Sequence, residues 1–194
     1  MTRQFQEGKV VIFCAPSGAG KTSIVHELLK KELKLSFSIS ACTREQRKNE
    51  KNGIDYYFLT VDEFKKSISN DSFIEWEEVY ENQFYGTLKK EIHRIWKANK
   101  HVIFDVDVKG GIALKQHFKE NALAIFIQPP SIEELQKRLI KRGTDNTNSI
   151  NKRIEKAKYE LSFIKSFDAI IVNNLLSDAV TEAEHHVRNF LSLS

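Results

Sequence analysis

Cysteine and proline are scarce in this chain, and their scarcity excludes some architectures. Cys14 and Cys42 are the only two cysteines, too few for a disulfide framework and without the paired spacing of a zinc site. With three prolines in the whole sequence, no proline-rich linker separates one part of the chain from another. The six histidines show no ligand spacing, so nothing in the Cys or His pattern indicates a metal site.

Long apolar runs are also missing. No run approaches the roughly 20 residues that span a bilayer, and residues 1–5 lack the apolar core of a signal peptide. We therefore expect a cytoplasmic protein without a membrane partner. The formal charge of +4, from 30 basic and 26 acidic residues, suits an anionic small molecule as well as a nucleic acid. Because a clear basic stripe or stacking platform is missing, we expect no nucleic-acid partner.

Length and apolar content predict one compact domain of the α/β class. The chain has 194 residues, of which 41% are hydrophobic, enough for a sizeable core with a mobile subdomain. Short β-type runs alternate with helical patterns, as in a mostly parallel sheet flanked by helices. The core strands are expected at residues 10–14, 37–40, 101–106, 122–127 and 169–172. The helices are expected at residues 21–31, 87–98, 111–118, 131–141, 149–164 and 177–191.

Residues 41–87 interrupt this alternation. Two short strands are expected at residues 56–59 and 72–76, joined by a helix that begins at the capping-box pair Thr60 and Glu63. No linker bounds the segment, so the pattern predicts an inserted β-rich subdomain with its own small sheet rather than an independent domain.

The most informative motif is a glycine-rich loop between an apolar strand and a helix. Residues 15–22 read APSGAGKT, which matches the phosphate-loop pattern GxxxxGK[ST] except for Ala15. Small residues let backbone N–H groups converge on phosphate oxygens at a helix N-terminus. Lys21 adds a charge at the phosphates, and Thr22 offers a hydroxyl to Mg²⁺. An ordinary strand-to-helix turn is the alternative, but the context favours a nucleoside triphosphate site.

Two acids follow another apolar strand. Asp105 ends the run Val102–Phe104, the position from which a carboxylate reaches Mg²⁺ in a phosphate-loop protein. Alternatively, Asp105 caps the helix that begins near Gly110. Asp107, two residues on, is expected on the same strand face.

Arginines and a carboxylate–hydroxyl pair suggest how a second substrate is bound. Arg44 and Arg47 form a plausible clamp for a second phosphate, although a solvated basic loop fits this polar stretch slightly better. Glu75 beside Thr87 suits a base with adjacent N–H donors and a carbonyl, the pattern of guanine, and a mispaired base would leave polar groups unsatisfied.

A pair of basic helices is typical of a closing lid. Arg138 and Arg142 are four residues apart, and Arg153 follows after the polar loop 143–148. Such cations can close over a transferring phosphoryl group. A surface helix pair rich in Lys and Arg is the alternative.

Taken together, these stretches resemble the guanylate kinases, the ATP-dependent kinases of GMP, over nearly the whole chain. The matching stretches are residues 15–22, 38–44, 55–58, 73–75, 85–87, 105–110, 142–144, 152–153 and 171–173. The resemblance implies the phosphate-loop kinase fold, with a core of residues 1–40, 88–136 and 154–194. It implies a GMP-binding subdomain at about 41–87 and a helical lid at about 137–153.

The resemblance also implies roles for individual residues, with ATP and GMP as substrates and Mg²⁺ as cofactor. The residues implied to bind ATP are Ala15, Pro16, Ser17, Gly18, Ala19, Gly20, Lys21, Thr22, Arg138 and Asn173. The residues implied to bind the GMP phosphate are Ser40, Arg44, Arg47, Tyr56 and Tyr85. Those implied to bind guanine are Glu75, Thr87 and Asp107. Thr22 and Asp105 are implied to hold the metal, and Lys21, Arg142 and Arg153 are implied to be catalytic.

Some positions depart from the family pattern, and two other functions stay open. Gln46 and Asn49 stand where a proline and a glycine are usual, and Cys42 replaces a hydroxyl residue. One rival is a non-enzymatic scaffold domain, which typically has a degraded phosphate loop. The other is a kinase of ribose 1,5-bisphosphate, which should lack the guanine-reading set. Residues 174–194 form an amphipathic helix that packs on the core or, in a homodimer, on a second copy of the chain.

Overall fold

The computed structural model describes residues 7–142 and 147–192, without the side chains of Arg142 and Thr147. The chain divides into two compact units. The insert unit consists of Met1–Gly8 and Ser36–Val102, and the core unit consists of Lys9–Leu35 and Ile103–Ser194. The chain crosses between them after Gly8 and again within strands β2 (Leu35–Phe37) and β7 (His101–Val106).

A five-stranded sheet in the order β2-β7-β1-β8-β9 forms the centre of the fold. Strand β1 (Val10–Cys14) pairs in parallel with β8 (Ala122–Gln128), which pairs in parallel with β9 (Ala169–Val172). All five residues of β1 are buried, as expected for a strand that is covered on both faces and therefore reads as a continuous apolar run. The predicted mostly parallel sheet flanked by helices is confirmed.

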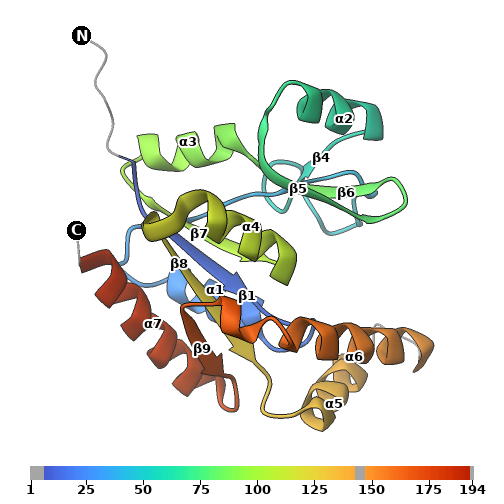
Figure 1. Ribbon diagram of the computed structural model, residues 1–194, viewed down its shortest axis with the longest axis vertical. Coiled ribbons are helices and arrows are strands. Elements are labelled where there is room, and N and C mark those ends of the chain that lie inside the picture. Colours follow the sequence, from blue (N-terminus) through green and yellow to red (C-terminus); the bar gives the residue numbers. More distant parts are fainter. Residues whose placement is uncertain (1–6, 143–146, 193–194) are drawn as a thin grey trace. The chain divides into compact units, whose positions relative to one another are not determined.

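The α-helices of the core unit pack on this sheet or, in the case of the two that precede β9, on each other (Figure 1). They are α1 (Lys21–Leu29), α4 (Val108–Phe118), α5 (Ile132–Arg142), α6 (Thr147–Leu161) and α7 (Leu176–Ser192), with 3-10 turns at Lys119–Asn121 and Ile164–Ser166. Helix α4 packs closely on β1 because Gly111 has no side chain, and a Cβ there would lie 2.0 Å from the Sγ of Cys14. Helices α5 and α6 join through a cluster of apolar residues that includes Leu139 and Ile154. Helix α7 packs on α1 and β9, which is the predicted packing on the core.

The insert unit contains a second, four-stranded sheet in the order β4-β3-β6-β5. Its elements are β3 (Ala41–Cys42), β4 (Tyr57–Phe58), α2 (Val61–Ser69), β5 (Phe73–Tyr80), β6 (Gln83–Leu88) and α3 (Lys89–Lys97). The predicted capping box is present, because Thr60 accepts from the N–H of Glu63 while the Glu63 side chain accepts from that of Thr60. Phe64 of α2 lies against Phe73 and Phe84, with ring centroids 4.3 and 5.4 Å away.

Several predicted element boundaries are wrong, and two of them have a clear physical reason. The strand expected at residues 37–40 ends at Phe37, since the backbone N–H of Ile39 donates to a side chain, Glu91, instead of a sheet neighbour. The helix expected from Gly111 begins at Val108, because the carboxylate of Asp107 caps it. Strand β6 includes Thr87, which had been placed at the start of a helix. Within the described residues, no helix is long and apolar enough to cross a membrane.

The aromatic stack of Phe64, Phe73 and Phe84 is expected to stabilise the insert unit. Phe64 is fully buried, so Phe64→Ala should lower the free energy of unfolding by about 3–5 kcal/mol through lost burial and an unfilled cavity. Denaturant unfolding followed by circular dichroism measures this loss. Tyr80→Ala, at a 67% exposed position of the same sheet, is the control, and an equal loss in both variants would contradict the assignment.

Candidate functional site

The glycine-rich loop connects β1 to α1 with a backbone that only small residues allow. Gly18 and Gly20 have φ angles of 94° and 93°, in the left-handed region that glycine adopts without strain. A Cβ on Gly20 would lie 2.2 Å from Nδ2 of Asn173, whose amide donates to the carbonyl of Ala19 at 2.7 Å. Helix α1 has no side-chain N-cap and no acidic residue in its first turn. Its first N–H groups are thus suited to an anion.

Lys21, Thr22 and Asp105 form a compact polar cluster beside this loop. Lys21 Nζ lies 2.5 Å from Oδ1 of Asp105 and also donates to the carbonyl of Val106. The hydroxyl of Thr22 donates to Oδ2 of Asp105 at 2.6 Å. Both charged side chains are only 14% exposed. Because β7 lies beside β1 in the sheet, a carboxylate at the end of β7 reaches the first turn of α1.

Thr22 and Asp105 are also the residues that fit a hard cation such as Mg²⁺. A hydroxyl and a carboxylate are oxygen ligands, and Mg²⁺ in nucleotide sites takes one or two protein oxygens and completes its shell with water and phosphate. No group of three or more His, Cys, Asp or Glu that could hold a metal occurs in the described part of the chain. The donor set therefore fits a metal that arrives with its phosphates.

Asp107 has a different local role from the one its spacing predicted. It lies beyond the end of β7 and caps α4, accepting the N–H of Gly110 at 2.9 Å, so the expectation of a shared strand face with Asp105 is wrong. The capping role that had been the alternative for Asp105 belongs to Asp107. Its carbonyl accepts from the thiol of Cys14 at 3.3 Å, and burial raises the pKa of that thiol far above its usual range. Cys14 is accordingly a small neutral core residue.

The structure describes the contacts of two of the three arginines predicted for the lid and ATP site in α5 and α6. Arg153 Nη1 donates to Oγ of Ser17 at 2.7 Å, which ties α6 to the phosphate loop. Arg138 Nη2 donates to the carbonyl of Asn173 at 3.0 Å, and its Nε to Glu134 at 3.3 Å. The side chain of Arg142 and residues 143–146, inside the expected lid, lie outside the described residues.

In the insert unit, Arg44 is held by Glu50, the glutamate that follows Asn49 in the loop where the chain departs from the family pattern. Its Nη1 and Nη2 donate to the two oxygens of Glu50 at 2.7 and 2.6 Å, a bidentate geometry that strengthens charge-assisted bonds. This contact lowers the pKa of Glu50 to about 2. The guanidinium also lies 4.8 Å from the ring centroid of Tyr56 and 5.5 Å from that of Phe58, within range of cation–π attraction.

The loop after Arg44 folds around the same carboxylate. The N–H of Arg47 donates to Glu50 at 2.9 Å, and the side chain of Gln46 donates to the carbonyl of Glu50. The Arg47 side chain itself is exposed. Gln46, one of the departures from the family pattern, thus contributes a bond that closes the loop.

Glu75 and Thr87 face each other across the β5–β6 pair. The hydroxyl of Thr87 donates to Oε1 of Glu75 at 2.6 Å, and Thr87 is fully buried. Nearby on β6, Tyr85 lies edge-on to Tyr56, with ring centroids 6.2 Å apart, and burial raises the pKa of its hydroxyl. The unit therefore brings together the predicted phosphate-binding aromatics and the predicted base-reading pair. Asp107, assigned to the same base, belongs to the core unit.

Comparisons with known proteins match nearly the whole chain to guanylate kinases. The family model described as guanylate kinase matches residues 7–190. The chain is similar to the guanylate kinase of Bacteroides fragilis, with 50% identity over 187 residues that cover 96% of this chain and 92% of that protein. The guanylate kinase of Porphyromonas gingivalis is 47% identical over 185 residues, which cover 95% and 98% of the two chains.

A solved structure extends the similarity to three dimensions. The crystal structure of guanylate kinase from Anaplasma phagocytophilum matches with a TM-score of 0.75 at 28% identity, covering 94% of this chain and 85% of that one. This match and the strand order confirm the predicted α/β phosphate-loop kinase fold. The chain belongs to the guanylate kinase family.

Proposed function

We propose that the chain transfers the γ-phosphoryl group of ATP to GMP, giving ADP and GDP, and that the reaction is reversible. The observation that carries the proposal is the intact cluster of Lys21, Thr22 and Asp105 at the N-terminus of α1, in a chain of the guanylate kinase family. A non-enzymatic scaffold domain would be expected to lack such a cluster. The pair of Glu75 and Thr87 separates this function from that of a sugar bisphosphate kinase.

ATP is assigned to the core unit. The loop of residues 15–22 offers backbone N–H groups to the phosphates, and Lys21 adds a point charge. Arg138 and Asn173 are assigned to the nucleotide as well, because Arg138 donates to the carbonyl of Asn173 and the amide of Asn173 donates to the loop carbonyl of Ala19. Bound Mg²⁺, held by Thr22 and Asp105, would neutralise charge on the β- and γ-phosphate oxygens.

GMP is assigned chiefly to the insert unit. Ser40, Arg44, Arg47, Tyr56 and Tyr85 bind its phosphate. Glu75 and Thr87, together with Asp107 of the core unit, bind guanine. A carboxylate accepts from adjacent N–H donors, whereas adenine presents an acceptor at N1, so AMP would leave buried polar groups unpaired.

The chemistry asks for positioning and positive charge. An oxygen of the GMP phosphate attacks the γ-phosphorus while the bond to the ADP oxygen breaks, with charge spread over the equatorial oxygens. Because the attacking phosphate is already largely ionised near neutral pH, no general base is needed. Lys21, Arg142 and Arg153 supply cationic charge. The contact of Arg153 with Ser17 supports its place beside the phosphate loop.

The proposal also covers the division of the chain into functional parts, its binding partners and its location in the cell. Residues at about 41–87 form the GMP-binding subdomain and those at about 137–153 a lid that excludes water during transfer. The partners are the two nucleotides, without nucleic acid or membrane, and the reaction takes place in the cytoplasm. A homodimer stays a prediction, which the mass of the particle in solution decides.

The proposal is tested by measuring ADP formation from Mg-ATP with separate acceptors. GMP should give rapid turnover and AMP and UMP little, since only guanine matches Glu75 and Thr87. Turnover with ribose 1,5-bisphosphate alone would replace the proposal with the sugar kinase. No turnover with any acceptor, from folded protein that binds GMP, would favour a binding module. Measuring dGMP alongside shows whether the ribose hydroxyl matters.

Lys21→Ala should lower kcat by at least about 10²–10³-fold, the loss seen when one preorganised electrostatic contact to a transition state is removed. Steady-state kinetics with saturating ATP and GMP measures it. Lys30→Ala is the matched control, because Lys30 follows the same helix, is 67% exposed and pairs with Glu27 at the surface. Retained turnover in Lys21→Ala would sink the assignment.

Glu75→Gln should raise the KM for GMP by about 10–100-fold, because the amide offers a donor where guanine also donates. The KM for ATP should stay within about twofold, since ATP is assigned to the other unit. Glu78→Gln on the same strand, where Glu78 is exposed and accepts from the Asn82 N–H, should leave both KM values unchanged. Equal effects of the two substitutions would remove Glu75 from the base-reading set.

A further inference from the structure

Glu91 is a buried carboxylate that the proposed reaction does not use. It lies in α3 and is 1% exposed. Arg94 donates to it from Nε and Nη2 at 2.9 and 2.7 Å. The hydroxyl of Tyr57 donates at 2.9 Å, and the backbone N–H of Ile39 at 3.1 Å. A carboxylate is costly to bury without such partners, so its four donors need a joint explanation.

The contacts of Glu91 close a ring around Ser40. Its carboxylate holds the N–H of Ile39, and Tyr57 links the other side, because its hydroxyl donates to Glu91. The backbone N–H of the same tyrosine donates to the carbonyl of Ser40 at 2.9 Å. The two anchored peptide groups therefore flank Ile39 and Ser40.

This anchoring matters because Ile39 lies outside the strands, whereas the Ser40 carbonyl is held by the pairing of β3 with β4 through the Tyr57 N–H. Strand β2 ends at Phe37 and β3 begins at Ala41. Between them, the N–H of Ile39 is bound by the Glu91 side chain of α3, and the carbonyl of Ser40 by the backbone N–H of Tyr57 in β4. Glu91 reaches these residues from one direction and Tyr57 from the other, so a shift of either would move Ser40.

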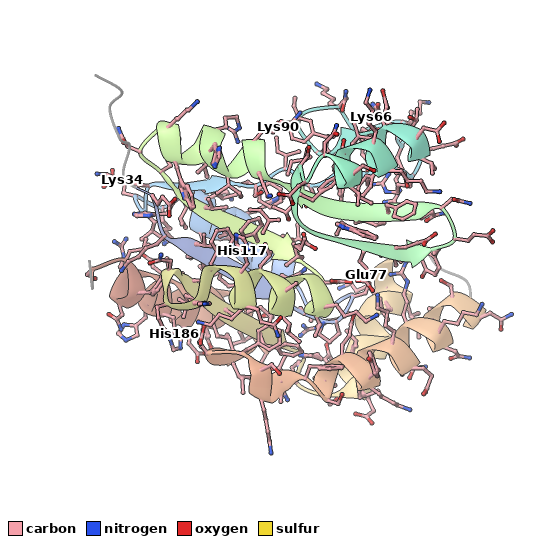
Figure 2. All side chains as sticks on the ribbon, turned by 45° about the horizontal axis from the view of Figure 1, so that its top comes forward. Lys34, Lys66, Glu77, Lys90, His117 and His186 are labelled. Atoms are coloured by element: carbon pink, nitrogen blue, oxygen red, sulfur yellow. The ribbon has the colours of Figure 1, made fainter. Side chains whose placement is uncertain are left out.

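The charges around the ring keep each group in the protonation state that these bonds need. Burial alone would raise the pKa of Glu91, but hydrogen bonds from Arg94, Ile39 and Tyr57 outweigh it and lower that pKa. Burial and the carboxylate raise the pKa of the Tyr57 hydroxyl, so it remains a donor. Lys90, labelled in Figure 2, lies with its Nζ 5.1 Å from the Tyr57 ring centroid.

We propose that Glu91 is a positioning residue for the GMP phosphate, which fixes the backbone on both sides of Ser40 and thereby places the Ser40 hydroxyl. The inference rests on the proposed function, in which Ser40 binds that phosphate. Glu91 itself contacts no substrate in this assignment. A residue with only a structural role would support the fold of the insert unit without regard to Ser40.

The first test is Glu91→Gln, which keeps the shape but replaces one acceptor oxygen with a donor. The KM for GMP should rise about tenfold, the effect of losing one hydrogen bond to a charged group. The KM for ATP and the melting temperature should change little. Glu184→Gln is the matched control, because Glu184 is also a helical glutamate that pairs with an arginine, Arg188. An unchanged KM for GMP in Glu91→Gln would overturn the positioning role.

A double-mutant cycle with Ser40→Ala separates positioning from general support. If Glu91 acts through Ser40, Glu91→Gln should raise the KM for GMP less than twofold in the Ser40→Ala background. An equal rise in both backgrounds would overturn the inference. Tyr57→Phe, which removes one bond of the ring, gives the same comparison if Glu91→Gln fails to fold. Wild-type protein that does not phosphorylate GMP would instead overturn the proposed function, and the inference with it.

Discussion

Two of the cations assigned to phosphate, Lys21 and Arg44, are each held in advance by a carboxylate, one in each unit of the chain. Lys21 lies against Asp105 in the core unit, and Arg44 lies against Glu50 in the insert unit. Long basic side chains lose about 2 kcal/mol of rotamer entropy when they are fixed. The carboxylates stabilise the fixed positions before any nucleotide arrives. Arginine keeps further donors for a ligand, because its guanidinium has five N–H groups and Glu50 uses only part of them.

Much of the core unit could be predicted because its determinants are local. Five consecutive apolar residues predict β1, and the glycines after it predict the turn, since a left-handed backbone at Gly18 and Gly20 needs no long-range information. The pairing of Glu75 with Thr87 was also within reach, because an alternating strand pattern on either side of a turn brings such positions together. The meeting of Lys21 with Asp105 follows from placing β7 beside β1. The phosphate-loop motif predicted that Asp105 would lie near Lys21, whereas the strand propensity of the two segments did not.

The remaining features depended on partners far away in the sequence. Strand β2 stops at Phe37 because Ile39 bonds to a side chain 52 residues away. Glu91 reads as a solvated residue of an amphipathic helix until its burial is known. Asp107 was misplaced because strand periodicity was extended one residue past the end of β7, where capping takes over. Gln46 stands where a proline is usual, and its side chain bonds to the loop backbone at the Glu50 carbonyl.

In the proposed function, Glu50 and Glu91 order the groups that bind the GMP phosphate in a unit that presents no helix N-terminus to it. The core unit uses converging backbone N–H groups, which are fixed by the fold. The insert unit offers Ser40, Arg44 and aromatic rings, which are side chains on short, irregular segments, so their precision must come from other side chains. Glu50 orients the guanidinium directly, while Glu91 acts one step back through the peptide groups beside Ser40. Both carboxylates carry the same sign as the ligand. Each is neutralised by its own arginine, Arg44 or Arg94, which is what allows negative charge to organise an anion site.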